Sequence, residues 1–131
     1  MKVHYTFTAP IHIFTFVDNS RQAANDYMSL AEQEIIRWVQ AGYVDKPFCI
    51  LLDISTSGLF PLKYTIQRST SILDNYEKLP QRYIAYLTDN QMDISLLKSI
   101  ATTPQWNNTR RILPPAKRTD AIDWLLEVWG N

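Results

Sequence analysis

The sequence has little cysteine and little glycine: one cysteine, Cys49, and three glycines among 131 residues. A single cysteine cannot form a disulfide within the chain or a zinc site built on paired cysteines. Gly58 stands alone, without the Lys-Ser or Lys-Thr pair that follows a phosphate-binding glycine-rich loop. Cys49 lies in an apolar run, away from His4 and His12, so we interpret it as a small buried residue rather than a nucleophile.

The sequence also lacks a net charge, because 13 basic and 13 acidic side chains cancel. A neutral chain has no overall field that attracts a polyanion, so we expect no nucleic-acid partner. One basic cluster is interpreted as solvated strand ends and a helix entrance, and it consists of Arg110, Arg111, Lys117 and Arg118.

Long apolar runs are missing as well. None approaches the roughly 18 apolar residues of a membrane span, and the first ten residues alternate polar and apolar, unlike a signal peptide. With 46% hydrophobic and 20% charged residues, the composition is ordinary for a globular protein. We therefore expect one cytoplasmic domain, residues 1–131, with no membrane span.

Five segments have the patterns of strands: 2–8, 11–17, 48–52, 82–88 and 110–113. The first alternates polar and apolar residues, as a half-buried strand does, and Pro10 separates it from the second. These two segments predict a hairpin. The third is a continuous apolar run, which is typical of a strand covered on both faces.

Four segments have the patterns of helices: about 20–41, 61–77, 90–103 and 119–129. In each, apolar residues recur at intervals of three or four, and Gly42 follows the first where a left-handed C-cap falls. The apolar stripe of the third helix includes Ile100 and Ala101, and Pro104 ends it. A polar turn is predicted for residues 106–109.

The predicted order is β-β-α-β-α-β-α-β-α, with short connections. Strict alternation after the hairpin predicts parallel strands joined by right-handed crossovers. We therefore predict an α/β fold: a single mixed, mostly parallel sheet of about five strands, with four helices on both faces. Ligands and partners of such sheets meet the carboxyl ends of the strands, which here are residues 53–58, 88–90 and 113–117.

Two of these carboxyl ends carry an aspartate, Asp53 and Asp89. Facing one crevice, the two carboxylates could hold Mg²⁺ or serve an enzyme of unrecognised type. Alternatively, each aspartate hydrogen-bonds within a loop or at a helix N-terminus. We assign no catalytic residue, metal or cofactor, and expect a protein that is not an enzyme.

The loop after the third predicted strand holds three hydroxyl side chains, Ser55, Thr56 and Ser57, ahead of the second predicted helix. A phosphate at a helix N-terminus is stabilised by free N–H groups and by the helix dipole, so phosphorylation there would switch a surface by charge. Alternatively, the hydroxyls only cap and turn the chain.

Three short motifs punctuate the sequence: Ile-Leu-Leu-Asp-Ile-Ser at 50–55, Ser-Gly-Leu at 57–59, and Ala-x-x-Trp-Leu at 121–125. Together with the opening strand pair, they resemble the STAS domains of bacterial anti-sigma factor antagonists, and in particular a divergent branch related to small lipid carriers. The resemblance spans nearly the whole chain. It implies the same α/β fold and a regulatory, non-enzymatic function.

The corresponding loop of the antagonists reads Asp-Ser-Ser-Gly-Leu, with the first serine as the kinase target. Placing Gly58 and Leu59 on that motif implies a phosphoacceptor at Thr56, with Ser57 beside it and Ser55 at the aspartate position. The resemblance further implies a partner-binding surface on the loop and the following helix, with the residues Asp53, Ser55, Gly58, Leu59 and Phe60. Because the acceptor position is altered, we expect contact with a partner rather than modification.

The implied partner is an anti-sigma factor or a kinase-like regulator, or a second copy of the chain in a homodimer. The alternative function implied by the resemblance is that of a carrier for a small apolar, lipid-like ligand. The many aromatic residues are compatible with such a carrier.

Overall fold

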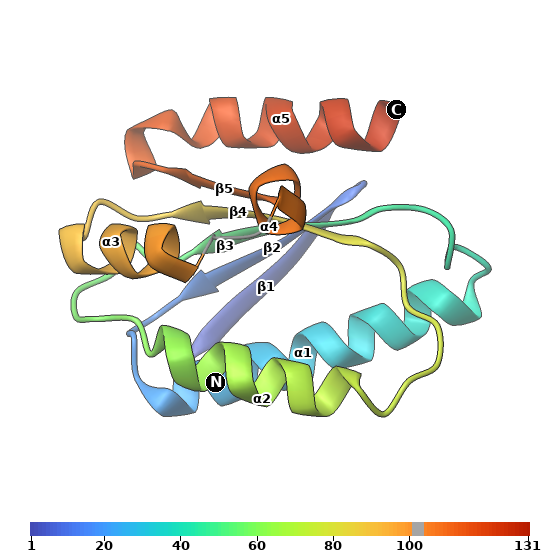
Figure 1. Cartoon of the computed structure of the whole chain (residues 1–131), viewed down its shortest axis with the longest axis horizontal. Helices are drawn as coiled ribbons and strands as arrows, with labels where there is room; N and C mark the ends of the chain where they lie inside the picture. The colour runs from blue at the N-terminus through green and yellow to red at the C-terminus, as the bar shows by residue number, and fades with distance from the viewer. Residues whose placement is uncertain (101–103) are drawn as a thin grey trace.

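The computed structural model describes residues 1–100 and 104–131, which form one five-stranded sheet (Figure 1). Its strands are β1 (Val3–Thr8), β2 (Ile11–Phe16), β3 (Phe48–Asp53), β4 (Arg82–Leu87) and β5 (Arg110–Leu113). β1 pairs antiparallel with β2, and all other neighbours are parallel. The strand order in the sheet is the order in the chain. The predicted hairpin and the mixed, mostly parallel sheet are confirmed.

The described residues form helices α1 (Arg21–Gln40), α2 (Leu62–Leu73), α3 (Gln91–Ile100), α4 (Pro104–Thr109) and α5 (Arg118–Gly130), and a 3-10 turn, η1 (Pro115–Lys117). In Figure 1, α1 and α2 lie below the sheet and α5 lies above it, so both faces carry helices as predicted. Over the described ranges, no helix combines the length and the apolarity that crossing a bilayer requires.

The second helix is shorter than its apolar pattern predicts. α2 ends at Leu73 rather than near Glu77. The side-chain amide of Asn75 donates to two carbonyl oxygens of the last turn, at 3.4 and 3.3 Å. Because that amide takes up carbonyls that a further turn would have used, the chain leaves the helix there.

The predicted polar turn at 106–109 is instead part of the short helix α4. This helical turn places the indole ring of Trp106 parallel to the ring of Tyr86, with centroids 6.4 Å apart. An aromatic contact with the sheet therefore favours helix over turn. Ala101, the last residue of the predicted stripe of α3, lies outside the described residues.

The central strand β3 is covered on both faces, as its sequence predicts. Phe48, Ile50 and Leu52 pack on the face that α1 and α2 cover, whereas Cys49 and Leu51 pack against α5. All five side chains are at most 1% exposed. Cys49 is thus the small buried residue that the sequence indicated, and burial raises the pKa of its thiol to about 11.

Backbone hydrogen bonds beyond the strands join the loops at the carboxyl edge of the sheet. The N–H of Ile54 donates to the carbonyl of Leu87 at 3.1 Å, and the N–H of Thr88 donates to the carbonyl of Leu113 at 3.0 Å. The segments that follow β3, β4 and β5 therefore start side by side.

Candidate functional site

The 55–60 loop is held in one shape by Asn19, which precedes α1. Its Nδ2 donates to three backbone carbonyls, those of Ile54 (3.2 Å), Thr56 (3.5 Å) and Gly58 (2.8 Å). Gly58 has a φ of +96°, in the left-handed region that glycine adopts at little cost. One amide and one glycine together fix the turn of this loop.

The tip of the loop is exposed and its far end is anchored. Leu59 is 46% exposed, whereas Phe60 is 2% exposed. The backbone N–H of Phe60 donates to the carboxylate of Asp93 in α3, at 3.1 Å. Asp93 is itself buried, and burial raises the pKa of its carboxyl group above the ordinary value. The loop therefore presents one apolar side chain on a fixed backbone.

The three hydroxyls of the loop have separate surroundings. Thr56 Oγ1 donates to the carbonyl of Val17 at 3.1 Å, and the hydroxyl of Ser55 donates to the carboxylate of Asp53. Ser57 is exposed. The N-cap residue of α2, Pro61, makes no side-chain capping hydrogen bond in the described part of the chain. The hydroxyls of Ser55 and Thr56 thus brace the loop against its neighbours.

The two predicted aspartates do different things. Asp53 accepts the N–H of Ser55 at 3.0 Å and pairs with Arg118 at 3.4 Å, which is the loop-bonding alternative. Asp89 is exposed, and the cap of α3 is Asn90, whose Oδ1 accepts two N–H groups of the first turn at 3.0 Å. Within 1–100 and 104–131, no three histidine, cysteine or acidic side chains gather as a set of metal ligands.

The basic cluster is divided between the two faces of the sheet. The guanidinium of Arg110 lies 5.2 Å from the ring centroid of Trp106 in α4, whereas that of Arg111 lies 5.1 Å from the ring centroid of Trp124 in α5. Arg118 instead pairs with Asp53 at the carboxyl edge. These cations therefore form no single patch.

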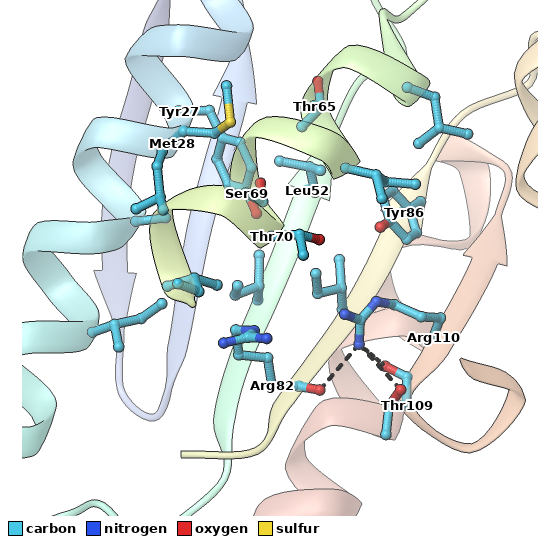
Figure 2. Close-up of a pocket in the computed structure, with 18 of the residues that line it drawn as sticks. Tyr27, Met28, Leu52, Thr65, Ser69, Thr70, Arg82, Tyr86, Thr109 and Arg110 are labelled. Atoms are coloured by element: carbon cyan, nitrogen blue, oxygen red, sulfur yellow. Dashed lines mark hydrogen bonds between the residues drawn. The ribbon is translucent and has the colours of Figure 1, made fainter. Parts of the chain in front are cut away.

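A cavity of about 300 Å³ lies between α1, α2 and the sheet, with residues of α4 and β5 at one end (Figure 2). Most of its wall is aliphatic and aromatic, and the aliphatic part includes Met28, Ile35, Ile50, Leu52, Ile66 and Ile84. The exposed residues Thr70 and Gln81 also line it, so its rim reaches the surface beside α2. We call this space the α1–α2 cavity.

Hydroxyl groups are spaced along the wall of the α1–α2 cavity. Figure 2 shows Tyr27 of α1, Ser69 and Thr70 of α2 and Tyr86 of β4 around it. Burial raises the pKa of both Tyr27 and Tyr86 above the ordinary tyrosine value, so these two phenols stay neutral. The cavity thus offers an occupant several neutral hydrogen-bonding groups.

Two arginines from neighbouring strands occupy one end of the α1–α2 cavity, Arg82 at the start of β4 and Arg110 at the start of β5. Nη1 of Arg110 donates to the carbonyl of Arg82 at 3.1 Å, to the carbonyl of Thr109 at 3.2 Å and to the hydroxyl of Thr109 at 3.1 Å. Its Nε is buried and has no hydrogen-bond partner in the described part of the chain. Arg110 is therefore fixed in position through Nη1, while its buried Nε is left unused.

The charge of this pair is not balanced nearby. In the described ranges, neither Arg82 nor Arg110 forms an ion pair. The one carboxylate among the lining residues, Glu32, accepts the hydroxyl of Tyr76 at 2.7 Å. Burial, and then the neighbouring Arg110 cation, lower the pKa of Arg82. Since arginine stays protonated in proteins, this shift reflects first the cost of burying the Arg82 cation and then the cost of holding Arg110 beside it.

Sequence reasoning missed the α1–α2 cavity and its arginines. The signal was present in the strand alternation: Arg82, Ile84 and Tyr86 share one face of β4, and Arg110 lies opposite Ile84 in the parallel pairing of β4 with β5. A charged residue on an otherwise apolar strand face indicates that a polar group or a ligand lies beside that face, because charged side chains are rarely buried without a partner.

No protein-family model, curated protein or solved structure matches this chain. The resemblance to STAS domains therefore stays a prediction, and the geometry of the described residues carries the functional argument.

Proposed function

We propose that this chain binds a small, largely apolar molecule in the α1–α2 cavity and acts as a carrier for it. The cavity is the observation that supports this proposal. Protein cores pack as tightly as organic crystals and contain few voids larger than a water molecule. A space of about 300 Å³ is at the lower end of the range of small-molecule sites, roughly 300–1,000 Å³.

The lining favours an apolar occupant over water. Aliphatic and aromatic residues from α1, α2, β3 and β4 are the majority of the lining residues, and an apolar cavity of even about 150 Å³ binds benzene. Taking about 30 Å³ for each water-sized unit, the space accommodates on the order of ten heavy atoms. The expected ligand is therefore a short aliphatic or aromatic molecule.

Titration with 1-octanol, followed by NMR of the side-chain methyl groups, tests this proposal. Binding in the cavity shifts the methyl signals of Ile50, Leu52 and Ile84, which line it, and leaves those of Leu51, which packs against α5, in place. Saturable shifts confined to the lining residues are the expected result. Shifts spread over both faces, or none, contradict the proposal.

Two matched variants of α2 sharpen the test. Ser69 lines the cavity, whereas Ser71 is exposed on the same helix and is not among the lining residues. Ser69→Leu fills the cavity with a good helix former and is expected to weaken octanol binding at least about tenfold, the loss that follows from about 1.4 kcal/mol. Ser71→Leu makes the same change toward solvent and leaves binding intact. Equal binding by both variants contradicts the cavity as the site.

A second candidate function is contact with a protein partner through the 55–60 loop. The observation that favours it is Leu59, which is 46% exposed on a backbone that Asn19 holds in place. A preformed loop loses little entropy on docking, so one exposed apolar side chain contributes most of its burial energy. The partner proposed here is an anti-sigma factor, a kinase-like regulator or a second copy of the chain.

Sedimentation of the wild type and of Leu59→Asp tests the self-association form of this candidate. A dimer that dissociates in the variant supports a contact at the loop, and a concentration-independent monomer contradicts it. Intact-mass measurement after incubation with a cognate kinase tests modification at Thr56 or Ser57. An unchanged mass removes that part.

A further inference from the structure

We propose that the occupant of the α1–α2 cavity is an anionic amphiphile, with an acidic head at the Arg82 and Arg110 end and an apolar chain along α2. This inference rests on the ligand-binding function proposed above and adds the charge and the orientation of the ligand. The head is a carboxylate or a phosphate monoester, since both present the oxygens that guanidinium groups bind in pairs.

Unbalanced charge is the first argument for an anion. Arg82 and Arg110 are both only partly exposed, and in the described ranges no carboxylate forms an ion pair with either. Charges that leave water are normally compensated by an opposite charge, because unpaired burial costs several kcal/mol. Two unpaired cations that line one cavity therefore call for an anion from outside the chain.

Unused hydrogen-bond donors are the second argument. Nε of Arg110 is buried without a partner, and no hydrogen bond from the guanidinium of Arg82 to a described residue occurs. Nη1 of Arg110, in contrast, donates to the carbonyl oxygens of Arg82 and Thr109 and to the hydroxyl of Thr109. These hydrogen bonds hold the Arg110 guanidinium in place, so binding an anion requires little reorganisation.

The length of the cavity indicates the shape of the apolar part of the ligand. Leu62 and Leu73, the first and last residues of α2, both line it. Helix geometry places these residues roughly 16 Å apart along the axis. Arg82 and Arg110 lie at the amino ends of the parallel strands β4 and β5, whereas Phe60 and Leu62 come after the carboxyl end of β3, which lies at the opposite edge of the sheet. An extended single chain therefore fits better than a compact ring.

The negative charge in the lining of the cavity does not oppose this arrangement. Glu32 of α1 is the one carboxylate among the lining residues, and the hydroxyl of Tyr76 donates to it at 2.7 Å. Its charge is thus partly stabilised by a donor outside the cavity. The net formal charge of the lining residues is positive, since two arginines and one glutamate contribute.

Competition among matched probes tests this inference. Octanoate, octyl phosphate and 1-octanol share one apolar chain and differ in the head, and their dissociation constants follow from methyl-shift titrations at neutral pH. We expect at least one of the two anions to bind about tenfold or more tightly than 1-octanol, because a guanidinium forms stronger, paired hydrogen bonds with an anionic head than with a neutral hydroxyl. The better of the two anions identifies the head.

Arginine variants locate the preference. Arg82→Gln removes a guanidinium without breaking a hydrogen bond of the described fold. Arg111→Gln is the control, because Arg111 is exposed and lies on the other face of the sheet, over the ring of Trp124 in α5. We expect Arg82→Gln to remove the preference for the anion, so that octanoate and octyl phosphate bind no more tightly than 1-octanol does. Arg111→Gln should leave this preference as in the wild type, which excludes a general effect of net charge.

The two proposals fail separately. Equal affinity of the wild type for all three probes, or an undiminished preference in Arg82→Gln, overturns the anionic head and leaves the apolar cavity intact as a ligand site. Absence of methyl shifts with every probe overturns the carrier function and this inference together.

Discussion

The imidazole of His12 in β2 stacks on the ring of Phe48 in β3, with centroids 4.0 Å apart and planes inclined by 17°. The two rings lie beneath Trp38 of α1, whose indole meets each of them edge-on. His12 is 2% exposed, its Nδ1 is 2.8 Å from the hydroxyl of Tyr5, and its Nε2 has no partner among the described residues. Burial in this aromatic cluster favours the neutral imidazole of His12 over the charged form.

The stability of the fold should therefore fall between pH 6.5 and pH 4. Burial lowers the pKa of His12 from 6.5 to about 4, so in this range the unfolded chain binds a proton that the folded chain does not. Stability contributed by the neutral ring is complete above pH 6.5 and is lost as the pH falls toward 4, by up to about 3 kcal/mol. Urea unfolding at pH 5 and pH 7 measures the difference.

His12→Phe provides the comparison, because phenylalanine keeps the aromatic stacking and does not titrate. The variant should show a smaller loss of stability from pH 7 to pH 5 than the wild type does. His4→Ala, at an exposed position of β1, should retain the wild-type loss. Equal pH dependence of the wild type and His12→Phe contradicts the assignment of the titrating group.

Asn19→Ala should loosen the 55–60 loop. The substitution removes the amide that donates to the carbonyls of Ile54 and Gly58 and should cost about 1–2 kcal/mol of unfolding free energy. Asn25→Ala is the control, since Asn25 makes one exposed hydrogen bond, to the hydroxyl of Tyr64, and should cost less than about 0.5 kcal/mol. Amide hydrogen exchange of residues 55–60 should accelerate in the first variant alone, and unchanged exchange there argues against the brace.

Gly58→Ala should destabilise the chain through its backbone alone. The φ of +96° is strained for any residue with a Cβ, at a cost of about 1–2 kcal/mol, although the added atom meets nothing nearer than Asn19 Cβ at 3.9 Å. Gly130→Ala, in a helix with open space around the added atom, should be neutral or slightly stabilising. Thermal unfolding of the two variants compares them directly, and a neutral Gly58→Ala contradicts the left-handed turn.

Cys49 should resist alkylation in the folded protein. Its side chain is 0% exposed, its Sγ lies 3.7 Å from the carbonyl of Leu125, and burial raises the pKa of the thiol to about 11. Because the thiolate is the reactive species, iodoacetamide at pH 8 should label the native chain far more slowly than the urea-unfolded chain. Mass spectrometry over time measures both rates. Rapid native labelling shows that α5 opens away from the sheet.

The sheet could be predicted from the sequence because the pattern of apolar residues in each strand reflects which faces of that strand are buried. Residues 48–52 are apolar without interruption and are buried on both faces, and the polar and apolar alternation of β1 fits its place at the edge. The end of α2 could not be predicted, because a side-chain amide, that of Asn75, decides it. Periodicity reports which side of a helix is apolar and does not register such local hydrogen bonds.

The strand alternation marks Arg82 as a residue on an apolar face, but the volume of the α1–α2 cavity could not be predicted, for a related reason. The apolar faces of α2 and of β4 are each visible in the pattern, but whether two such faces meet or leave a gap depends on the sizes of the side chains between them. Ser69 and Thr70 of α2 are small where larger side chains would fill the space. The sequence predicts Arg110 as part of a surface cluster, because it does not distinguish which of two adjacent arginines points toward the core.

The strand order of the sheet bears on how the cavity is built. Each strand from β2 to β5 lies beside the strand that precedes it in the chain. The residues that line the cavity therefore follow one another across the sheet in chain order, from Tyr27 of α1 to Arg110 of β5. The last strand is an edge strand of four residues, joined to the sheet through β4 alone. A molecule bound by Arg110 would link this edge to the body of the protein, and it would stabilise β5 in the sheet by an amount that grows with the ratio of ligand concentration to dissociation constant.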